Sequence, residues 1–575
     1  MTYQETYEKW LHSPALSEEE RAELSAISGD EKEIESRFFG PLEFGTAGLR
    51  GTMNVGLHRM NVHVIRHATQ AFANVVLAEG QAAARAGVAI CFDCRNHSAE
   101  FAREAACVMA ANGVSVRLFD AMRPTPELSF AVRQYHCTAG INVTASHNPK
   151  EYNGYKVYWS DGAQLPPHHA AAIASQMERL DIFADIKTMS YDDAVAHGLI
   201  TLMGSETDDL FLTNVMAQVN DAAAVSKVAD TFKMVYTPFH GTGYQLIPEV
   251  LHRLGVKHLY CVPEQMVIDG NFPTVVSPNP ENPEGFYLAI DLAKKEGADF
   301  ILGSDPDADR VGIMVRDKTG EYITISGNQT GVLLLDYLIG AKKRAGTLPA
   351  NAAALKTIVT TEMARKVAES NGVSCFDTFT GFKFMAEKKN ALEAAGTHKV
   401  IFSYEESYGY MLGDYVRDKD AVTAALLLTE MAAWYAGQGM TLYDALQSLF
   451  EKYGYYGEKT LNLIMPGLEG MTQMKALMDG LRENPLTEIS GTPVLVRKDY
   501  SDGTATTLAT GETSSMELSG SNVLRYELSD GTTILVRPSG TEPKVKVYIL
   551  AQGADRADCD EKVSRYAAWA ETLRN

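Results

Sequence analysis

The sequence predicts an α/β protein of several domains. The chain has 575 residues, a length that suggests about four domains. Its composition, 45% apolar and 22% charged, is that of a globular protein with a substantial core. Apolar strands alternate with helical stretches as far as residue 454, an order typical of parallel sheets with right-handed crossover helices. From residue 455 the pattern changes to helices mixed with antiparallel-looking strands.

The first part of the chain favours helices and then a strand–helix–strand order. Residues 1–38 predict helices with acidic first turns, as where Ser17 precedes three glutamates. The elements expected next are a helix at 61–86, strands at 87–92, 114–119, 140–143 and 157–159, and a helix at 98–112. An acidic helical segment at 165–225 is expected to lead out of the first domain.

Similar strand–loop–helix units follow. The elements expected there are strands at 232–236, 299–303 and 399–403 and helices at 284–296, 327–345, 361–370 and 421–436. The proline-rich loop 273–283 is long and irregular, so it is either functional or a mobile flap. Near the end, strands at 533–536 and 545–549 flank an arginine-containing loop, and the second alternates apolar and polar residues. The domains expected are 1–205, 206–325, 326–454 and 455–575.

Charge and cysteine usage exclude several classes of partner. The formal net charge is −21, which argues against nucleic acid or an anionic membrane as the main partner. The apolar run at 424–428 is too short to span a bilayer, and the first residues are polar and acidic rather than leader-like. Seven scattered cysteines, with Cys91 and Cys94 as an isolated C-x-x-C, indicate reduced thiols. We therefore expect a cytoplasmic protein with a small-molecule partner.

A serine in a polar turn is the first candidate for chemistry. The apolar stretch 140–143 delivers Thr144-Ala145-Ser146-His147-Asn148-Pro149, which exposes a hydroxyl and leaves backbone N–H groups able to face an anion. Neighbouring residues of an extended segment point to opposite sides, so we do not expect Ser146 to pair with His147. The chain has no G-x-S-x-G elbow and no G-x-x-x-x-G-K-[ST] loop. A phosphorylated serine or a serine that only caps the turn are the two interpretations.

Three aspartates end a later apolar strand. Asp305, Asp307 and Asp309 stand at alternate positions, and oxygen-only ligands of this kind suit Mg²⁺. An EF-hand is excluded, because Arg310 and Arg316 occupy the positions of its glycine and glutamate. A phosphatase with Asp305 as the nucleophile and a solvated acidic turn are the alternatives.

Two more polar loops and several cations complete the candidates. Arg537-Pro538-Ser539-Gly540-Thr541, followed by Lys544 and Lys546, has the composition of a phosphate cradle, or of a surface turn. Glu405-Glu406-Ser407 follows a strand and offers groups for sugar hydroxyls, or a solvated turn. The glycine-rich stretch 44–51 permits close backbone approach and supplies Arg50. Four further cations stand at strand ends or helix starts, where anion sites form: Lys156, Lys383, Arg417 and Lys419.

Together these four loops resemble the α-D-phosphohexomutase family. The serine loop, the Asp305-x-Asp307-x-Asp309-Arg310 loop, the Glu405-Glu406-Ser407 loop and the Arg537 loop occur in the family's order, and the resemblance extends from Gly45 to Tyr548. It implies three similar mixed or parallel-sheet α/β domains and a smaller α+β C-terminal domain around a central cleft that all four loops face.

The resemblance also implies roles for individual residues. Ser146 would carry a phosphoryl group and complete the Mg²⁺ shell of Asp305, Asp307 and Asp309, with one ion per chain. Arg50, Lys156 and Lys419 would neutralise charge or move protons. The implied substrate-binding residues are His147, Arg310, Thr380, Gly381, Lys383, Glu405, Ser407, Arg417, Arg537, Ser539, Gly540, Thr541 and Lys546.

The implied reaction interconverts glucose 1-phosphate and glucose 6-phosphate through glucose 1,6-bisphosphate, which is both intermediate and activator. The stretches 45–50 and 403–409 look most like the bacterial glucose-type and phosphopentomutase-like branch. The alternatives are a phosphopentomutase, a phosphomannomutase, and a synthase that makes glucose 1,6-bisphosphate with the same phosphoserine. A non-catalytic phosphosugar-binding module should lack Ser146 or one of the aspartates, and the chain has all four.

Overall fold

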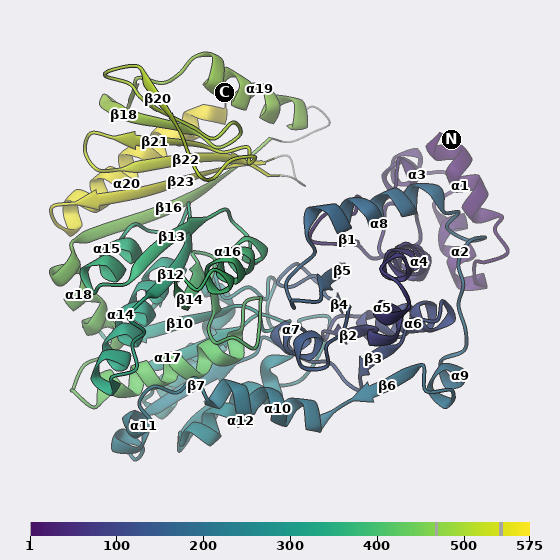
Figure 1. Cartoon of the computed structure of the whole chain (residues 1–575), viewed down its shortest axis with the longest axis horizontal. Coiled ribbons are helices and arrows are strands. Elements are labelled where there is room, and N and C mark those ends of the chain that lie inside the picture. The colour runs from purple at the N-terminus through teal and green to yellow at the C-terminus, as the bar shows by residue number, and fades with distance from the viewer. Residues whose placement is uncertain (1, 466–469, 540–543, 575) are drawn as a thin grey trace. The chain divides into compact units, whose positions relative to one another are not determined.

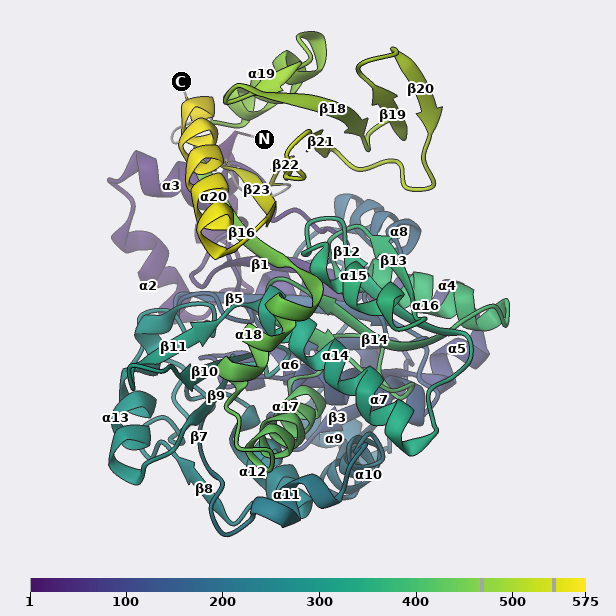
Figure 2. The same ribbon diagram turned by 90° about the vertical axis from the view of Figure 1, so that its left-hand side faces the viewer.

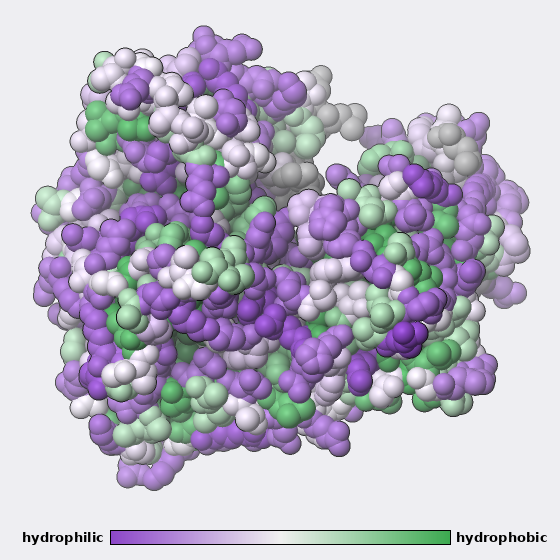
Figure 3. All heavy atoms as spheres, viewed as in Figure 1, coloured by the Kyte–Doolittle hydropathy of each residue, from purple (hydrophilic) through white to green (hydrophobic). Residues whose placement is uncertain are grey.

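The computed structural model describes residues 2–465, 470–539 and 544–574. The chain forms two compact units, one of residues 1–326 and 407–441 and one of residues 327–406 and 442–575. We call them unit 1 and unit 2. Hydrophilic residues cover much of the face drawn in Figure 3, with hydrophobic residues in small scattered groups. Among the described residues, no helix combines the length and the apolar character needed to cross a membrane.

Unit 1 begins with three short helices, and two of them have complete capping boxes. They are α1 (Tyr3–Leu11), α2 (Glu18–Ala26) and α3 (Glu31–Phe38). The Ser17 hydroxyl accepts the backbone N–H of Glu20, and the Glu20 carboxylate accepts that of Ser17, as the acidic first turn predicted. Trp10 and Phe38 bury their rings edge to face between α1 and α3, which fixes these helices to each other.

The first sheet of unit 1 has six strands. They are β1 (Leu49–Thr52), β2 (Val88–Phe92), β3 (Val116–Phe119), β4 (Ala139–Val143), β5 (Tyr152–Trp159) and β6 (Ile200–Met203). The order is β1-β5-β4-β2-β3-β6, in which β4, β2, β3 and β6 are parallel and β5 and β1 join antiparallel. The sequence therefore predicted a parallel core correctly and did not reveal the antiparallel edge.

Helices cover both faces of this sheet. They are α4 (Val62–Ala78), α5 (Gln81–Ala86), α6 (Ser98–Ala111), α7 (Thr125–Gln134) and α8 (Pro167–Arg179) (Figure 1). Val88 and Ile90 of β2 join the core cluster that contains α4 and α6 residues, whereas Ala89 and Cys91 join the cluster that contains α7 residues. Successive side chains of a strand point to opposite faces of the sheet, and here both faces are buried.

Two helical predictions in this part of the chain were inaccurate. The helix expected at 61–86 breaks at Gly80, whose φ of 102° no other residue type adopts easily, into α4 and α5. The segment expected to be helical at 165–225 contains α8, α9 (Tyr191–Ala196), α10 (Ser205–Met216) and α11 (Ala223–Val228), but also β6. A four-residue strand gives too few alternations to be recognised among helices, and only its pairing with β3 reveals it.

The second sheet of unit 1 has the order β11-β10-β9-β7-β8. Its strands are β7 (Lys233–Thr237), β8 (His258–Cys261), β9 (Phe300–Ser304), β10 (Val311–Arg316) and β11 (Tyr322–Ile325). The helices are α12 (Gly243–Leu254), the short 3-10 turn η1 (Pro283–Phe286), α13 (Tyr287–Glu296) and α17 (Ala421–Ala436), the last preceded by β15 (Gly409–Met411). Strands β9 and β10 form an antiparallel hairpin, so the aspartates of the loop between them lie at the end of β9.

Unit 2 contains a parallel sheet and an antiparallel one. The first has β13 (Ser374–Thr378), β12 (Ala352–Thr357) and β14 (Lys399–Glu405) in that order, with α14 (Gly327–Ala345), α15 (Met363–Ser370), α16 (Phe382–Ala394) and α18 (Leu442–Tyr453). The second has the order β16-β23-β22-β21-β18-β19-β20, with β17 paired to β18. Its strands are β16 (Tyr455–Ile464), β17 (Glu488–Ile489), β18 (Thr492–Asp499), β19 (Thr504–Thr507), β20 (Glu512–Ser515), β21 (Leu524–Leu528), β22 (Thr533–Pro538) and β23 (Lys544–Gly553).

Two helices cover one face of the antiparallel sheet. They are α19 (Gly470–Glu483) and α20 (Arg556–Glu571), and α20, drawn in yellow in Figures 1 and 2, packs against β16 and β23. A core cluster on the sheet combines Val523 and Leu535 with Ile358 and Val359, which follow β12. The two sheets of unit 2 thus share buried apolar contacts. The domain boundaries expected from the sequence, 205, 325 and 454, stay predictions.

A partly buried ion-pair network also joins the two sheets of unit 2. Lys356 of β12 is 1% exposed, and its Nζ lies 2.9 Å from Asp377 and 3.2 Å from Glu362. Arg525 of β21 approaches Glu362 to 3.4 Å, and Arg365 approaches Asp377 to 2.7 Å. Burial alone would raise the pKa of Glu362, but Lys356 and the two arginines lower it to about 2. Glu362 therefore stabilises unit 2 as a carboxylate.

Candidate active site

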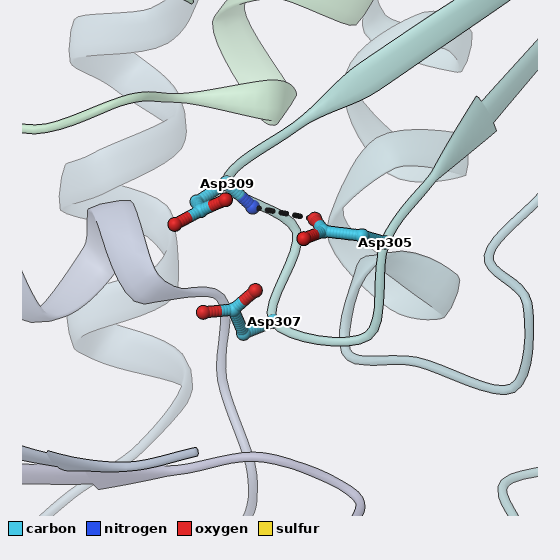
Figure 4. Close-up of side chains that lie close together, drawn as sticks. All are labelled: Asp305, Asp307 and Asp309. Atoms are coloured by element: carbon cyan, nitrogen blue, oxygen red, sulfur yellow. Dashed lines mark hydrogen bonds between the residues drawn. The ribbon is translucent and has the colours of Figure 1, made fainter. Parts of the chain in front are cut away.

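Three carboxylates meet in the loop between β9 and β10. Asp305, Asp307 and Asp309 are all buried, and one oxygen of each lies within 4.8 Å of the others (Figure 4). Ala308 adopts a left-handed φ of 49°, which turns the loop between the second and third aspartates. The alternating positions that suggested a metal site therefore do place the three side chains around one point.

Protein groups contact both oxygens of Asp305 but only one oxygen of Asp309. The Asp305 Oδ1 accepts the backbone N–H groups of Asp309 and Arg310 at 3.1 and 2.9 Å. The Asp305 Oδ2 accepts the hydroxyl of Ser146 at 3.1 Å. The Oδ2 of Asp309 lies 3.1 Å from Lys419 Nζ, whereas its Oδ1 has no hydrogen-bond partner among the described residues.

In Asp307, as in Asp309, protein donors hold only one of the two carboxylate oxygens. Its Oδ2 accepts both Lys156 Nζ and Thr125 Oγ1 at 2.7 Å, and its Oδ1 has no hydrogen-bond partner within the described part of the chain. A buried carboxylate oxygen without a donor is costly unless a cation takes it. The arrangement therefore fits a divalent cation with oxygen ligands.

The electrostatics of the cluster support this interpretation. Burial, with Asp307 and Asp309 beside it, raises the pKa of Asp305 well above its usual range. Burial would also raise the pKa of Asp307, but Lys156 and Thr125 lower it below its usual range. Burial would lower the pKa of Lys156, but Asp307 and Asp309 raise it above its usual value, so the amine is protonated. Three carboxylates this close repel one another, and a cation relieves that repulsion.

Ser146 lies at the edge of the cluster in a strained backbone conformation. Its φ is 53°, in the left-handed region that a serine rarely adopts, and it is 4% exposed. His147 Nδ1 lies 3.2 Å from Ser146 Oγ, so the expectation that these neighbours do not pair was wrong. The premise of an extended segment fails at this residue. The pKa of His147 is lowered by burial and by Arg310 and Arg50, which leaves the imidazole neutral.

A single arginine holds the serine loop, and the sequence analysis did not assign it to the site. Arg95 donates four hydrogen bonds of 2.5–3.1 Å to backbone carbonyls, those of Ser146, Asn148, Pro149 and Tyr152. Its Nε lies 3.3 Å from Asp93, and neither side chain is exposed. The signal was available, because Asp93-Cys94-Arg95 directly follows β2, and polar residues at the carboxyl ends of parallel strands line ligand sites.

The hydroxyl of Thr144 connects this clamp to the serine. Thr144 Oγ1 donates to Asp93 Oδ2 at 2.5 Å and accepts the backbone N–H of Ser146 at 2.9 Å. Burial raises the pKa of Asp93 above its usual value, and Arg95 and the hydroxyls of Thr144 and Ser98 oppose that rise only in part. The left-handed turn at Ser146 is therefore fixed from both sides by buried polar groups.

Arg50 lies on β1, next to the serine loop, and its side chain is exposed. Its Nη1 donates to Asn148 Oδ1 at 3.0 Å. The preceding Gly48 has a φ of 80°, and a Cβ there would lie 1.8 Å from the carbonyl oxygen of Tyr155. The glycine-rich stretch thus brings the backbone against β5, and it places Arg50 beside the serine loop.

Two more predicted cations belong to unit 1. Arg310 donates to Glu281 of the proline-rich loop at 2.8 Å, and its Nε lies 3.8 Å from Asp309. Arg417 is buried, and its guanidinium donates to the carbonyls of Asp414 and Val416 at 2.9 Å. Unit 1 therefore brings Ser146, the three aspartates, Arg50, His147, Lys156, Arg310, Arg417 and Lys419 into one body.

The sugar-loop candidates lie mostly in unit 2. Gly381, with a φ of 115°, donates its backbone N–H to Glu405 Oε1 at 2.5 Å, and the neighbouring Lys383 lies over the ring of Phe384. Thr380 precedes this turn. Ser407 begins the segment that belongs to unit 1. Thus the structure brings Gly381 and Glu405 together.

Glu406 contacts two threonine hydroxyls at the end of β12. Its Oε2 accepts the hydroxyls of Thr357 and Thr360 at 3.3 and 3.2 Å. Burial and Glu405 raise the pKa of Glu406 to about 7, and Lys546 opposes that rise. Lys546 lies on β23, one of the two strands that flank the predicted phosphate loop.

The predicted phosphate loop connects β22 and β23. Arg537 and Lys546 are register partners on these strands, and the backbone N–H of Ser539 donates to the carbonyl of Lys544 at 2.8 Å. Gly540 and Thr541 lie outside the described residues. The pKa of Tyr548, further along β23, is raised by burial, and Arg537 opposes that rise. Arg537 and Lys546 thus form a pair of cations at one end of the hairpin.

Four family models match the chain in order. They are described as the alpha/beta/alpha domains I, II and III of phosphoglucomutase/phosphomannomutase, at residues 41–182, 209–320 and 326–453, and the C-terminal domain, at residues 475–561.

Curated relatives match over nearly the full length. A phosphoglucomutase of Staphylococcus haemolyticus is 34% identical over 90% of this chain and 91% of its own. One of Staphylococcus aureus is 35% identical over 93% and 94%. The chain is a multidomain α/β enzyme of the intramolecular phosphotransferase class. It belongs to the phosphoglucomutase/phosphomannomutase family.

Solved structures share the fold. A protein of Thermus thermophilus described as a putative phosphomannomutase has a TM-score of 0.68 and 21% identity, and covers 93% of this chain and 99% of its own. Parafusin of Paramecium, a phosphoglucomutase, has a TM-score of 0.67 and 19% identity, with 93% and 95% covered. The multidomain α/β architecture expected from the sequence is confirmed.

Proposed function

We propose that this enzyme is a phosphoglucomutase that interconverts glucose 1-phosphate and glucose 6-phosphate through a phosphorylated Ser146. The observation that carries the proposal is the 3.1 Å contact between Ser146 Oγ and a carboxylate of the three-aspartate cluster. The phosphoglucomutase relatives, which match nearly the whole chain, favour glucose as the sugar.

The metal is proposed to be Mg²⁺. Asp307 and Asp309 would hold it through Oδ1, the oxygen that has no hydrogen-bond partner among the described residues, and Asp305 through Oδ2, which accepts the Ser146 hydroxyl in this structure. The phosphorylated Ser146 would supply a further oxygen. When bound, the ion neutralises charge that develops on the phosphoryl oxygens during transfer.

The proposed reaction has two transfers. In the first, the bond between the phosphorus and Ser146 Oγ breaks, and the free 6-hydroxyl of glucose 1-phosphate receives the phosphoryl group. The sugar hydroxyl loses its proton, Ser146 regains one, and the product is glucose 1,6-bisphosphate. After this intermediate reorients, Ser146 Oγ receives the phosphoryl group from position 1, and glucose 6-phosphate leaves. Phosphorus, charge and protons balance over the cycle, and glucose 1,6-bisphosphate also serves as activator.

Residues of unit 1 have distinct roles in this proposal. Lys156 is protonated, so it stabilises negative charge beside the cluster, as do Lys419 and Arg50. Neutral His147 lies within hydrogen-bond distance of Ser146 Oγ, so it can accept the serine proton when the hydroxyl is rephosphorylated. Arg310 and Arg417 are proposed to contact substrate phosphate.

Unit 2 supplies the proposed sugar and phosphate contacts. Glu405 would accept sugar hydroxyls together with Thr380, Gly381 and Lys383 of the same unit. Ser407, which begins the segment of unit 1, is also proposed to bind the sugar. The remote phosphate would be held by Arg537, Ser539, Gly540, Thr541 and Lys546. Arginine suits this role because its planar donors match two phosphate oxygens at once.

Ser146→Ala tests the proposal. The whole chain is incubated with glucose 1,6-bisphosphate, and its intact mass is measured before and after, followed by turnover of glucose 1-phosphate with Mg²⁺. Wild type should gain one phosphoryl group and produce glucose 6-phosphate without free phosphate, and Ser146→Ala should do neither.

Free phosphate from Ser146→Ala would instead identify a phosphatase, and the proposal would fail. Faster turnover of mannose or pentose phosphates than of glucose phosphates would contradict the proposed sugar. Net accumulation of glucose 1,6-bisphosphate from another donor would identify a synthase.

A further inference from the structure

Thr125 contacts Asp307 with both its side chain and its backbone. It is the first residue of α7, on the first sheet of unit 1, whereas Asp307 belongs to the β9–β10 loop of the second. Thr125 Oγ1 donates to Asp307 Oδ2 at 2.7 Å, and the Thr125 backbone N–H donates to the Asp307 carbonyl at 2.8 Å. Neither residue is exposed, so water does not compete for these bonds.

Asn142 of β4 sets the direction of the Thr125 hydroxyl. Its Nδ2 donates to Thr125 Oγ1 at 2.7 Å, and Asn142 is 1% exposed. A hydroxyl has one hydrogen to donate. Because the ionised Asp307 can only accept, that hydrogen belongs to it, and Asn142 must then present its amino group to Thr125. The three side chains form a buried chain in which each hydrogen has one possible direction.

The contact decides which oxygen of Asp307 remains for a ligand. Thr125 and Lys156 both occupy Oδ2, and Oδ1 is left without a hydrogen-bond partner among the described residues. Lys156 alone fixes the carboxylate less well, because its ammonium also approaches Asp309, to 3.5 Å, and rotates on a flexible stem. A β-branched threonine has few χ1 rotamers, so the position of its Oγ1 is restricted.

We propose that Thr125, oriented by Asn142, is a positioning residue of the metal centre, which turns Oδ1 of Asp307 toward the cation. The inference rests on the proposed metal site. Groups that orient a metal ligand from behind typically contribute about 10- to 100-fold to metal affinity when they are removed. Thr125 would act in this way on a carboxylate.

The test measures metal binding directly on the purified full-length chain. Mn²⁺ serves as the probe, and its free fraction is followed by electron paramagnetic resonance, without substrate. Thr125→Val keeps the shape and removes the hydroxyl, and we expect the Mn²⁺ Kd to rise about 10- to 100-fold. Thr125→Ser restores the hydroxyl and should bind nearly as wild type does.

A matched control separates positioning from general damage. Thr69 of α4 is equally buried, and its hydroxyl donates to the Ile65 carbonyl at 2.7 Å and pairs with Tyr155 at 3.0 Å. Thr69→Val should lower Tm without changing the Mn²⁺ Kd. If Thr125→Val does not fold, Asn142→Leu provides the second variant, since it removes the donor that directs the Thr125 hydroxyl and should also raise the Kd.

The outcomes are distinguishable. A folded Thr125→Val with the wild-type Kd, or a Thr69→Val that loses as much affinity, overturns the inference and leaves the metal site intact. Wild type that does not bind Mn²⁺, or an Asp307→Asn variant that binds as wild type does, overturns the metal site itself. An equal loss in Thr125→Ser would show that the hydroxyl is not the group responsible.

Discussion

Replacing Arg95 with lysine tests whether the buried clamp positions the nucleophile. Arg95 is 3% exposed and donates to four carbonyls of the serine loop, including that of Ser146. Lysine keeps the positive charge for Asp93 but has three donors on one nitrogen. At least one carbonyl then loses its donor in the interior, and the fork geometry is lost.

The magnitude follows from these contacts. One buried polar group without a partner costs about 1–3 kcal/mol, so Arg95→Lys should lower the free energy of unfolding by that amount. Because the carbonyl of Ser146 is one of the four, its hydroxyl should also move relative to Asp305. A displacement of about 1 Å at a reacting group can reduce the rate by about 10²-fold, and we expect kcat to fall by between about 10- and 100-fold. The KM for the sugar phosphate should change little, because no predicted sugar contact is touched.

Arg59 provides the control. It is 9% exposed in the same unit and donates to the Ser36 carbonyl and hydroxyl and to the His58 carbonyl. Arg59→Lys should cost similar stability and leave kcat unchanged. The assays are chemical denaturation and steady-state turnover of glucose 1-phosphate with saturating Mg²⁺ and glucose 1,6-bisphosphate. A wild-type kcat in Arg95→Lys, or an equal fall in Arg59→Lys, would refute the reasoning.

Three further predictions concern buried charges. Glu127 of α7 is fully buried, and burial and Asp208 raise its pKa well above the usual range. The native state then keeps a proton that the unfolded state loses, so stability falls as pH rises above about 4.5, and Glu127→Gln should raise Tm more at pH 8 than at pH 5. The pKa of Glu362 is lowered to about 2, so its contribution is present above about 4.5 and is lost as pH falls through 2. In Glu362→Gln, the free energy of unfolding measured with urea should depend less on pH across that acidic range than in wild type. An unchanged dependence on pH would contradict this. Lys356→Met removes a buried cation from Asp377 and Glu362, which are partly exposed and keep their arginine partners, so it should lower the urea-unfolding free energy by about 1–3 kcal/mol. Lys452→Met removes a lysine whose side chain is 57% exposed and should cost little.

The sequence was sufficient to predict that three carboxylates stand together at the end of a strand, whereas their role as metal ligands stays a prediction. Asp305, Asp307 and Asp309 follow an apolar run, and the strand that this run forms ends where the carboxylates begin. The information is local, because hydrophobic periodicity gives the strand and the alternation of residues gives the spacing. The same reasoning placed Ser146 after β4.

Lys156 and Lys419 were predicted as cations near the phosphoryl group, but no role was assigned from the sequence to Thr125 or Arg95. Thr125 and Asp307 are 182 positions apart, and Ser146 and Asp305 are 159 apart. Partners that far apart are identified only by the assembled fold. Residues at strand ends were a usable signal, since Arg95 and Thr125 both follow parallel strands of the first sheet. The Ser146–His147 contact was missed for a different reason, because a left-handed φ at a serine has no sequence signature.

The proposed metal cluster therefore belongs to unit 1 as an assembly and to neither of its sheets alone. The second sheet contributes the three carboxylates, the first contributes Thr125 and Lys156, and the segment before α17 contributes Lys419. A β9–β10 hairpin on its own would carry three carboxylates with their repulsion and few of the donors that orient them. A cation that binds this oriented set in the folded unit, and not in the unfolded chain, would also stabilise the packing of the two sheets through its binding free energy. The short acidic motif thus brings the three carboxylates together, whereas the threonine and lysines that direct them come from elsewhere in the chain.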